Sequence, residues 1–277
     1  MNKKTTKKRR RISKAQRKRQ QMATLGGMWL LVLVLVIALA VFVLESCGTD
    51  YTKADTNTVY VLKNGKVISA DVENFDVKTY SKDKMESYIN EIVDTYNEGK
   101  DRGSLKQRAL KVEKNIATLV LEYADTKVYE DVNGVELFSG TIKDASAAGY
   151  TFAGEFAQIK DGKAYAATVA DFAKDESYKV VIIKSNTKVV VPGAICFVST
   201  EHTAKVGKDY VSIKDGAKLL TEQEINTEFG SDTQGSDGAI GEDELVSGDG
   251  NMIFDFGDEP DTGSSQYSEV LTYIIYR

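Results

Sequence analysis

Residues 58–97, TVYVLKNGKVISADVENFDVKTYSKDKMESYINEIVDTYN, decide the fold. Two runs of strand-forming residues flank Asn64-Gly65, the pair that a two-residue hairpin turn favours because both of its central positions need positive φ. From Ser81 to Gly99 the apolar residues recur at helical spacing instead. A hairpin followed by an amphipathic helix predicts a helix laid across an antiparallel sheet, which is an α+β arrangement.

The predicted helix has one apolar face and recognisable ends. Its apolar face comprises Met85, Tyr88, Ile89, Ile92, Val93 and Tyr96. Asp83 and Glu86 resemble a capping box at its start, and Gly99 is a typical C-terminal stop. Burial against the sheet is the interpretation that this spacing favours, and a binding stripe of Tyr88 and Tyr96 is the alternative.

The rest of the chain continues with strands and turns. We predict hairpins over residues 109–123, turning at Lys114-Asn115, and over 152–169, turning at Asp161-Gly162, and a further hairpin turn at Ile213–Gly216. Residues 178–199 are expected to form strands, with a turn at Ser185-Asn186 and a bend at Pro192-Gly193. The remaining predictions are an irregular element at 129–134, short strands at 135–138 and 270–276, and a brief helix at 141–148. The expected fold is α+β, with a mainly antiparallel sheet built from hairpins and one long amphipathic helix.

An apolar segment precedes this domain. Seventeen residues from Met28 to Leu44 carry no charge. With the residues from Leu25 onward, a helix here would be about 30 Å long, the thickness of the bilayer hydrocarbon. Residues 1–24 hold 11 Lys and Arg and no acid, a pattern that keeps this end cytoplasmic. We therefore predict a basic cytoplasmic region at 1–24, and a signal peptide or membrane anchor at 25–47. A nucleic-acid-binding arm is the weaker interpretation of the basic block.

The end of the apolar segment resembles the lipobox of bacterial lipoprotein signal peptides. Leu44, Ser46 and Cys47 match that pattern, and Gly48 is a common following residue. Glu45 departs from it, because a small or aliphatic residue is usual there. The resemblance implies that Cys47 is lipidated and becomes the mature N-terminus. An uncleaved single-pass transmembrane anchor is the alternative, and both keep the protein on the membrane.

Charge separates the two ends of the chain. The first 46 residues hold 11 of the 36 basic and one of the 41 acidic residues, which leaves 25 basic and 40 acidic residues, a net charge of −15. This balance argues against nucleic acid and against anionic headgroups as partners. The second of two cysteines, Cys196, has no disulfide partner if Cys47 is lipidated. We expect the domain to lie outside the cell membrane.

The expected organisation beyond the anchor has four parts. Residues 48–57 are polar and predict a tether, and residues 58–225 form the extracytoplasmic α+β domain. Residues 226–265 contain 8 glycines and 11 acids. That composition predicts a disordered acidic loop. Residues 266–277 return as a C-terminal strand.

No catalytic or metal-binding signature is present. His202 is the only histidine and is expected in a polar loop, without a nucleophile motif near it. A zinc site of the usual type needs more His and Cys than the chain has. An EF-hand match starting at Thr233 lacks two carboxylate ligands. Cys196 is expected to be a buried small hydrophobe. We predict no catalytic residues, no metal site and no cofactor.

Residues 59–97, the closing TYIIYR and the anchor together resemble uncharacterised membrane-anchored lipoproteins of Gram-positive anaerobic bacteria. The resemblance implies surface anchoring and an α+β ectodomain, and no activity. We therefore predict a membrane-anchored lipoprotein with a binding or interaction domain for a cell-wall polymer or a surface protein. The alternative is an extracytoplasmic hydrolase that uses carboxylates, or a single-pass membrane protein with the same ectodomain.

Overall fold

The computed structural model describes residues 49–100, 103–229 and 267–277. The predicted anchor, its lipobox residues Leu44 to Gly48 and most of the predicted acidic loop lie outside these ranges. In the described ranges, no helix has both the length and the apolar character needed to cross a membrane. The described residues from Tyr51 onward form one compact unit.

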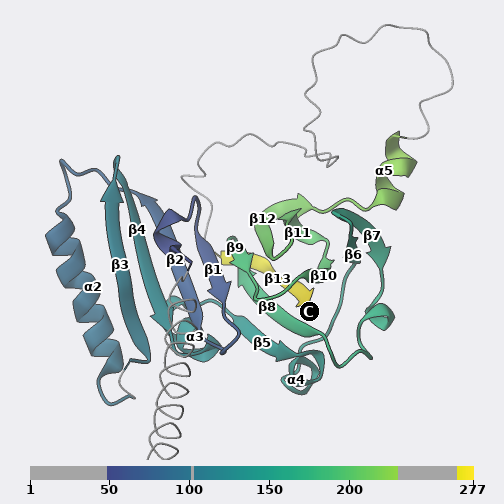
Figure 1. Cartoon of the computed structure of the whole chain (residues 1–277), viewed down its shortest axis with the longest axis horizontal. Helices are drawn as coiled ribbons and strands as arrows, with labels where there is room; N and C mark the ends of the chain where they lie inside the picture. Colours follow the sequence, from purple (N-terminus) through teal and green to yellow (C-terminus); the bar gives the residue numbers. More distant parts are fainter. Residues whose placement is uncertain (1–48, 101–102, 230–266) are drawn as a thin grey trace, which may run out of the picture. The chain divides into compact units, whose positions relative to one another are not determined.

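This unit is α+β with mostly antiparallel sheets, as the sequence predicts (Figure 1). Its strands are β1 (Thr58–Val61), β2 (Val67–Asn74), β3 (Leu105–Glu113), β4 (Ile116–Tyr123), β5 (Leu137–Thr141), β6 (Phe156–Lys160), β7 (Lys163–Ala167), β8 (Lys179–Ser185), β9 (Lys188–Val190), β10 (Ile195–Ser199), β11 (Glu201–Val206), β12 (Tyr210–Lys218) and β13 (Tyr267–Tyr276). Its helices are α2 (Lys82–Asn97), α3 (Thr126–Asn133), α4 (Ile142–Ala147) and α5 (Glu222–Phe229), with 3₁₀ turns η1 (Tyr51–Lys53) and η2 (Val169–Asp171).

The strands form two sheets, where the sequence predicts one. Sheet A has the order β11-β12-β9-β1-β2-β4-β3, and sheet B has the order β5-β8-β13-β10-β6-β7. The turn after β8 takes the chain from sheet B into sheet A, where β9 pairs with β1 in parallel. Local turn signals specify hairpins, but they do not say which sheet the next strand joins.

The two sheets enclose a main core. Residues from both sheets and from α3 contribute to it, including Val59, Val67, Tyr123, Tyr129, Val181, Ile183, Val198, Val211 and Ile274. Strand β8 shows why the sheets pack this way. Val181 and Ile183 face the main core, whereas the alternate residues Val180 and Ile182 face a second core on the other side of sheet B. A strand with such a continuous apolar run is buried on both faces.

The second core covers the outer face of sheet B, the side turned away from sheet A. Helix α4 and the segment around η2 supply its cover, with Ile142 from α4 and Phe172 just after η2. Phe172 lies edge-on to Phe156, with ring centroids 5.1 Å apart. Thr141 and Asp144 form a capping box at the start of α4, in which each side chain accepts a hydrogen bond from the backbone N–H of the other residue. Gly149 follows the helix with φ +96°. The brief helix predicted at 141–148 is therefore present, as α4. This aromatic layer forms the side of the domain on which the main hollow lies.

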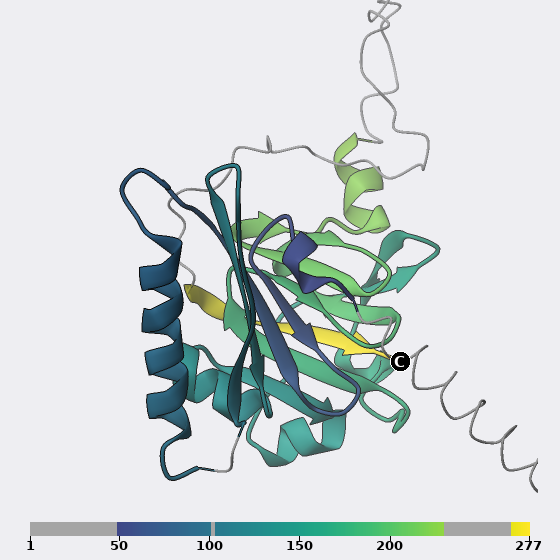
Figure 2. The same ribbon diagram turned by 60° about the vertical axis from the view of Figure 1, so that its left-hand side comes forward.

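Helix α2 packs less deeply than its apolar periodicity predicts. It contacts β3, the edge strand of sheet A (Figure 2). Ile89 is its only residue that is fully buried, while Tyr88 and Ile92 are 64% and 41% exposed. The N-cap is Ser81, whose hydroxyl accepts the Lys84 N–H, rather than the predicted box at Asp83 and Glu86.

The outer face of sheet A, the side away from the main core, carries a small apolar cluster that includes η1. Ile68, Ala70 and Val120 are buried there beneath Tyr51. The Tyr51 ring lies edge-on to Tyr60 at 4.8 Å. The predicted polar tether at 48–57 is therefore wrong from Tyr51 onward, because an aromatic residue within the polar run provides an apolar contact.

Three further local predictions are corrected. The residues around Tyr129 form the helix α3, with Asp125 as N-cap and Gly134 as the left-handed C-cap, rather than an irregular element. Residues 226–229 belong to α5, so the predicted acidic loop begins later than 226. Asp215-Gly216 lies inside β12 instead of turning a hairpin, and the register of β12 with β11 shifts nearby. Gly216 has φ +77°, which fits a bulge as well as a turn.

Candidate functional site

A hollow of about 410 Å³ lies at one end of the outer face of sheet B. It is built by segments far apart in the sequence: the residue before β5, the loop before β6, the ends of β8, β10 and β11, and the middle of β13. The side chains that give it chemical character are Glu136, Glu155, Lys184, Glu201, Leu271 and Tyr273. The hollow therefore combines an apolar part from β13 with charged side chains from its neighbours.

Tyr273 is the fixed part of this hollow. Its hydroxyl donates to the Thr151 carbonyl at 2.8 Å, and its backbone N–H donates to the Ser199 hydroxyl oxygen at 3.0 Å. The residue is 6% exposed and contacts Phe152 and Phe156 of the second core. Burial raises the pKa of Tyr273, and the Glu136 carboxylate adds to the effect. Its ring is therefore a rigid, neutral surface at physiological pH.

The carboxylates of the hollow differ in what holds them. Glu155 pairs with Lys218 at 3.0 Å, and Lys218 also pairs with Glu224 at 2.8 Å. The Lys218 ammonium lowers the pKa of Glu224 to about 2. Glu136 accepts a hydrogen bond from the Tyr150 hydroxyl, and burial together with this carboxylate raises the pKa of that tyrosine. Glu201 is exposed.

The lining has a net negative charge, with three glutamates against the single lysine Lys184. Negative carboxylates beside a neutral aromatic ring favour a ligand that carries a positive charge or several hydrogen-bond donors. In the described ranges, no three or more His, Cys, Asp or Glu side chains are grouped so that they could hold a metal ion.

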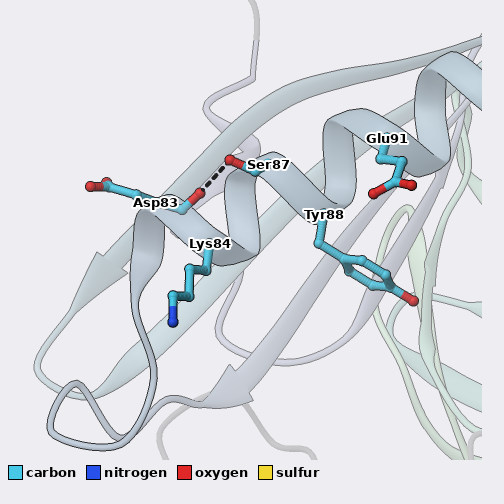
Figure 3. A pocket seen from close by; sticks show the side chains of 5 residues that line it. All are labelled: Asp83, Lys84, Ser87, Tyr88 and Glu91. Carbon is cyan, nitrogen blue, oxygen red and sulfur yellow. Dashed lines mark hydrogen bonds between the residues drawn. The ribbon is translucent and has the colours of Figure 1, made fainter.

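A second depression, of about 350 Å³, lies on helix α2 (Figure 3). Figure 3 shows that its lining side chains all come from successive turns of this one helix, with Tyr88 and Glu91 pointing outward. The Ser87 hydroxyl donates to the Asp83 carbonyl at 2.9 Å, a bond within the helix. A depression formed by one convex helix lacks an opposing wall, and we assign it no ligand.

Asp215 is the centre of a polar cluster that joins both sheets. Its carboxylate contacts His202 Nδ1 at 2.9 Å and accepts the Ser268 hydroxyl at 2.8 Å and the Asn186 amide at 2.8 Å. These hydrogen bonds lower its pKa despite the opposing effect of burial. In a catalytic triad the serine bonds to the histidine, whereas here serine and histidine share one carboxylate oxygen of Asp215. This geometry cross-links strands and does not activate Ser268.

The sequence predictions for His202 and Cys196 need correction. His202 lies in strand β11 with its side chain 18% exposed, rather than in a solvated loop. Its φ of +59° places it at the shifted register opposite β12. Cys196 is only partly buried, at a register shift between β10 and β13. Burial raises the pKa of its thiol, which keeps it protonated.

A third polar group lies between β2 and β4. The Ser69 hydroxyl donates to Asp71 Oδ2 at 2.9 Å and lies 3.1 Å from the Tyr123 hydroxyl. Burial raises the pKa of Asp71 to about 6 and that of Tyr123 to about 12. The chain of bonds runs from Tyr123 through Ser69 to Asp71. It satisfies polar groups on the main-core side of sheet A.

No protein-family model, curated protein or solved structure matches this chain. The function is therefore inferred from the site residues themselves. Sequence reasoning singled out none of the hollow's residues, because its carboxylates are isolated glutamates on different segments. The apolar and aromatic pattern of residues 270–276 was the one signal available, since it predicts the strand that carries Tyr273.

Proposed function

We propose that this protein is a membrane-anchored extracytoplasmic binding protein whose domain binds an amine-bearing ligand in the hollow on sheet B. The hollow is the observation that carries the proposal. It offers Tyr273 as a rigid aromatic surface, and Glu136 and Glu201 as carboxylates beside it. A ligand ammonium group would pair with the carboxylates while its carbon skeleton contacts the ring.

The anchoring part of this proposal is based on the sequence. The basic block at 1–24, the apolar segment at 25–47 and the lipobox-like Cys47 support attachment to the membrane, with the domain on the outer side. An extracytoplasmic ligand with free amines fits this location. Peptides and cell-wall polymers both present such groups.

Catalysis by carboxylates is the alternative, and one contact speaks against it. Glu155 is paired with Lys218, which leaves it poorly placed to donate or accept a proton during a reaction. Glycoside hydrolysis needs one carboxylic acid and one carboxylate on opposite sides of the scissile bond. Glu136 and Glu201 are the remaining pair, and the same experiment tests them for turnover.

The experiment measures binding of the full chain in detergent to amine-bearing and N-acetylated forms of the same probes, a lysyl peptide and an oligosaccharide of glucosamine. We expect binding of an amine form and at least tenfold weaker binding of its acetylated form. Glu136→Gln with Glu201→Gln should weaken binding about thirtyfold, since each of the two ion pairs in a partly desolvated site contributes about 1 kcal/mol. Glu98→Gln, on an exposed residue after α2, is the control.

Two results would contradict the proposal. Equal affinity for the amine and acetylated probes would remove the role of the carboxylates. Cleavage of the oligosaccharide, lost in the Glu136→Gln variant, would establish the hydrolase alternative.

A further inference from the structure

We infer that the outer face of sheet A is the membrane-facing side of the domain and contacts anionic lipid headgroups. This inference rests on the proposed anchoring, and it adds an orientation and a lipid partner. The observation behind it is the charge of this face. Basic side chains occur on it from one edge of the sheet to the other: Lys66, Lys106, Arg108, Lys111, Lys188 and Lys205.

Strand register assigns these side chains to the outer face. In the register of β3 and β4, Lys106 lies opposite Glu122 and Lys111 lies opposite Thr118. Glu122, Val120 and Thr118 are alternate residues of β4 and so lie on one face, and Val120 belongs to the outer cluster. Across the sheet, Lys188 pairs with Thr58 in β1. Lys205 pairs with Ser212, which in turn pairs with Lys188, so both lysines lie on one side.

Acidic residues on this face are already bonded to its basic residues. Glu122, with a side chain 3% exposed, is paired with Lys66 at 2.8 Å and with Arg108. Burial opposes the charge of Glu122, but the two cations keep its pKa low. Glu113 pairs with Lys111 at 3.1 Å and Asp55 with Lys188 at 3.4 Å. Among the described residues named above, six basic and three acidic side chains leave this face positive.

The positive face contrasts with the rest of the domain. Residues from Cys47 onward carry a net charge of −15. Eleven acids of residues 226–265 account for most of it, so the other residues from Cys47 onward carry 25 basic and 29 acidic residues, a net charge of −4 that is opposite in sign to this face. The average charge of the chain, which disfavours anionic headgroups as partners, hides a face of opposite sign.

The chain enters the domain on this same face. The 3₁₀ turn η1 contacts β3 and β4, and Tyr51 packs on the outer cluster. Cys47 is four residues before Tyr51, so the link spans at most about 14 Å when extended. A domain tied this closely keeps the entry face near the lipid surface, within about two Debye lengths at physiological ionic strength. Lipid headgroups are therefore the anion that the face meets first.

The test uses lysine acylation, read by mass spectrometry, on the full chain reconstituted in vesicles. One set is phosphatidylcholine and the other contains phosphatidylglycerol as well. The reporters are Lys106 and Lys205, both exposed on sheet A. The references are Lys143 and Lys174, both exposed beside the second core. We expect the reporters to be acylated severalfold more slowly than the references in anionic vesicles, with the difference reduced in phosphatidylcholine and at high salt.

Charge reversal provides the matched comparison. Lys106→Glu with Lys205→Glu should abolish the lipid-dependent protection of the remaining lysines on the face, since each basic residue near an anionic surface strengthens association about fivefold. Lys143→Glu with Lys174→Glu makes the same change in net charge and should leave the protection unchanged.

Different failures have different meanings. Protein that leaves the vesicles and the cell membrane fraction would contradict the proposed anchoring itself. Protein that stays on the vesicles, but shows equal acylation of reporters and references, would overturn the orientation and leave the anchoring intact. Protection produced by a soluble anionic wall polymer, and absent with vesicles, would also overturn the lipid inference.

Discussion

Replacing Asp71 with asparagine tests how much the ionised Asp71 carboxylate, on the core side of sheet A, lowers the free energy of unfolding. The carboxylate accepts the Ser69 hydroxyl at 2.9 Å, and burial raises its pKa to about 6, with a smaller contribution from Glu73. Asparagine keeps an oxygen that can accept the same hydroxyl and removes the charge. The variant should therefore be more stable than the wild type at pH 7.

The size of the effect follows from the pKa shift. A change from 3.8 to about 6 corresponds to about 3 kcal/mol at roughly 1.36 kcal/mol per pKa unit. Asp71 as a whole is only half-buried, so water screens part of this penalty. We expect the asparagine variant to gain about 1–2 kcal/mol at neutral pH.

The raised pKa also determines how the stability difference between the variant and the wild type changes with pH. Because the folded-state pKa is raised, protonated Asp71 favours the folded state fully below pH 3.8, and this stability is lost as the pH rises through about 6. The advantage of the variant should appear over that window. Urea unfolding of both proteins in detergent, followed by far-ultraviolet circular dichroism at pH 4 to 7, measures it. An advantage that is equal at pH 4 and pH 7, or a variant less stable than wild type at pH 7, would refute the reasoning.

Three further predictions concern other residues. Glu122→Gln should cost about 1–2 kcal/mol of unfolding free energy because Lys66 and Arg108 lose their shared partner, whereas Glu113→Gln, in an exposed pair, should change it by under about 0.5 kcal/mol in the same assay. Cys47→Ala should block lipid attachment and leave the precursor uncleaved. Intact-mass analysis of membrane-extracted wild type decides this, since a native species that keeps residues 1–46 and a free thiol establishes the single-pass anchor. Asp215→Ala should raise amide exchange in β11 and β12, because His202 and Asn186 lose their common acceptor, and unchanged exchange there would contradict the cross-linking role.

Local signals in the sequence predicted much of the fold. Asn64-Gly65, Lys114-Asn115 and Asp161-Gly162 each turn a hairpin. Both residues of the second and third pairs adopt positive φ, whereas in the first pair only Gly65 does, so the first turn is not the expected two-residue turn with two positive φ angles. The pattern at Asp215-Gly216 is similar, but its flanking residues continue one strand. A turn pair specifies local backbone conformation, and long-range pairing decides whether the result is a turn or a bulge.

Long-range pairing could not be predicted from these signals. The division into two sheets arises because β9 pairs with β1 and not with the preceding strand, β8. In this pairing Lys188 lies opposite Thr58, which is 130 residues earlier in the sequence. Helix α2 shows the same limit. Its spacing predicted a fully buried face, but a helix beside an edge strand has cover on one side only, and Tyr88 remains exposed.

The two proposed surfaces are related through the packing of the sheets. Alternate residues of β8 face opposite sides of sheet B, so the hollow, on the side of the second core, is separated from the main core by that sheet. Sheet A separates the main core from η1 and the basic face. The two surfaces therefore lie on opposite sides of the domain. If the basic face meets the lipid surface, the carboxylates around Tyr273 face away from anionic headgroups that would compete for the same cationic ligand. Their charge then attracts amines from the medium, and the positive face keeps the acidic remainder of the domain from being repelled by the membrane.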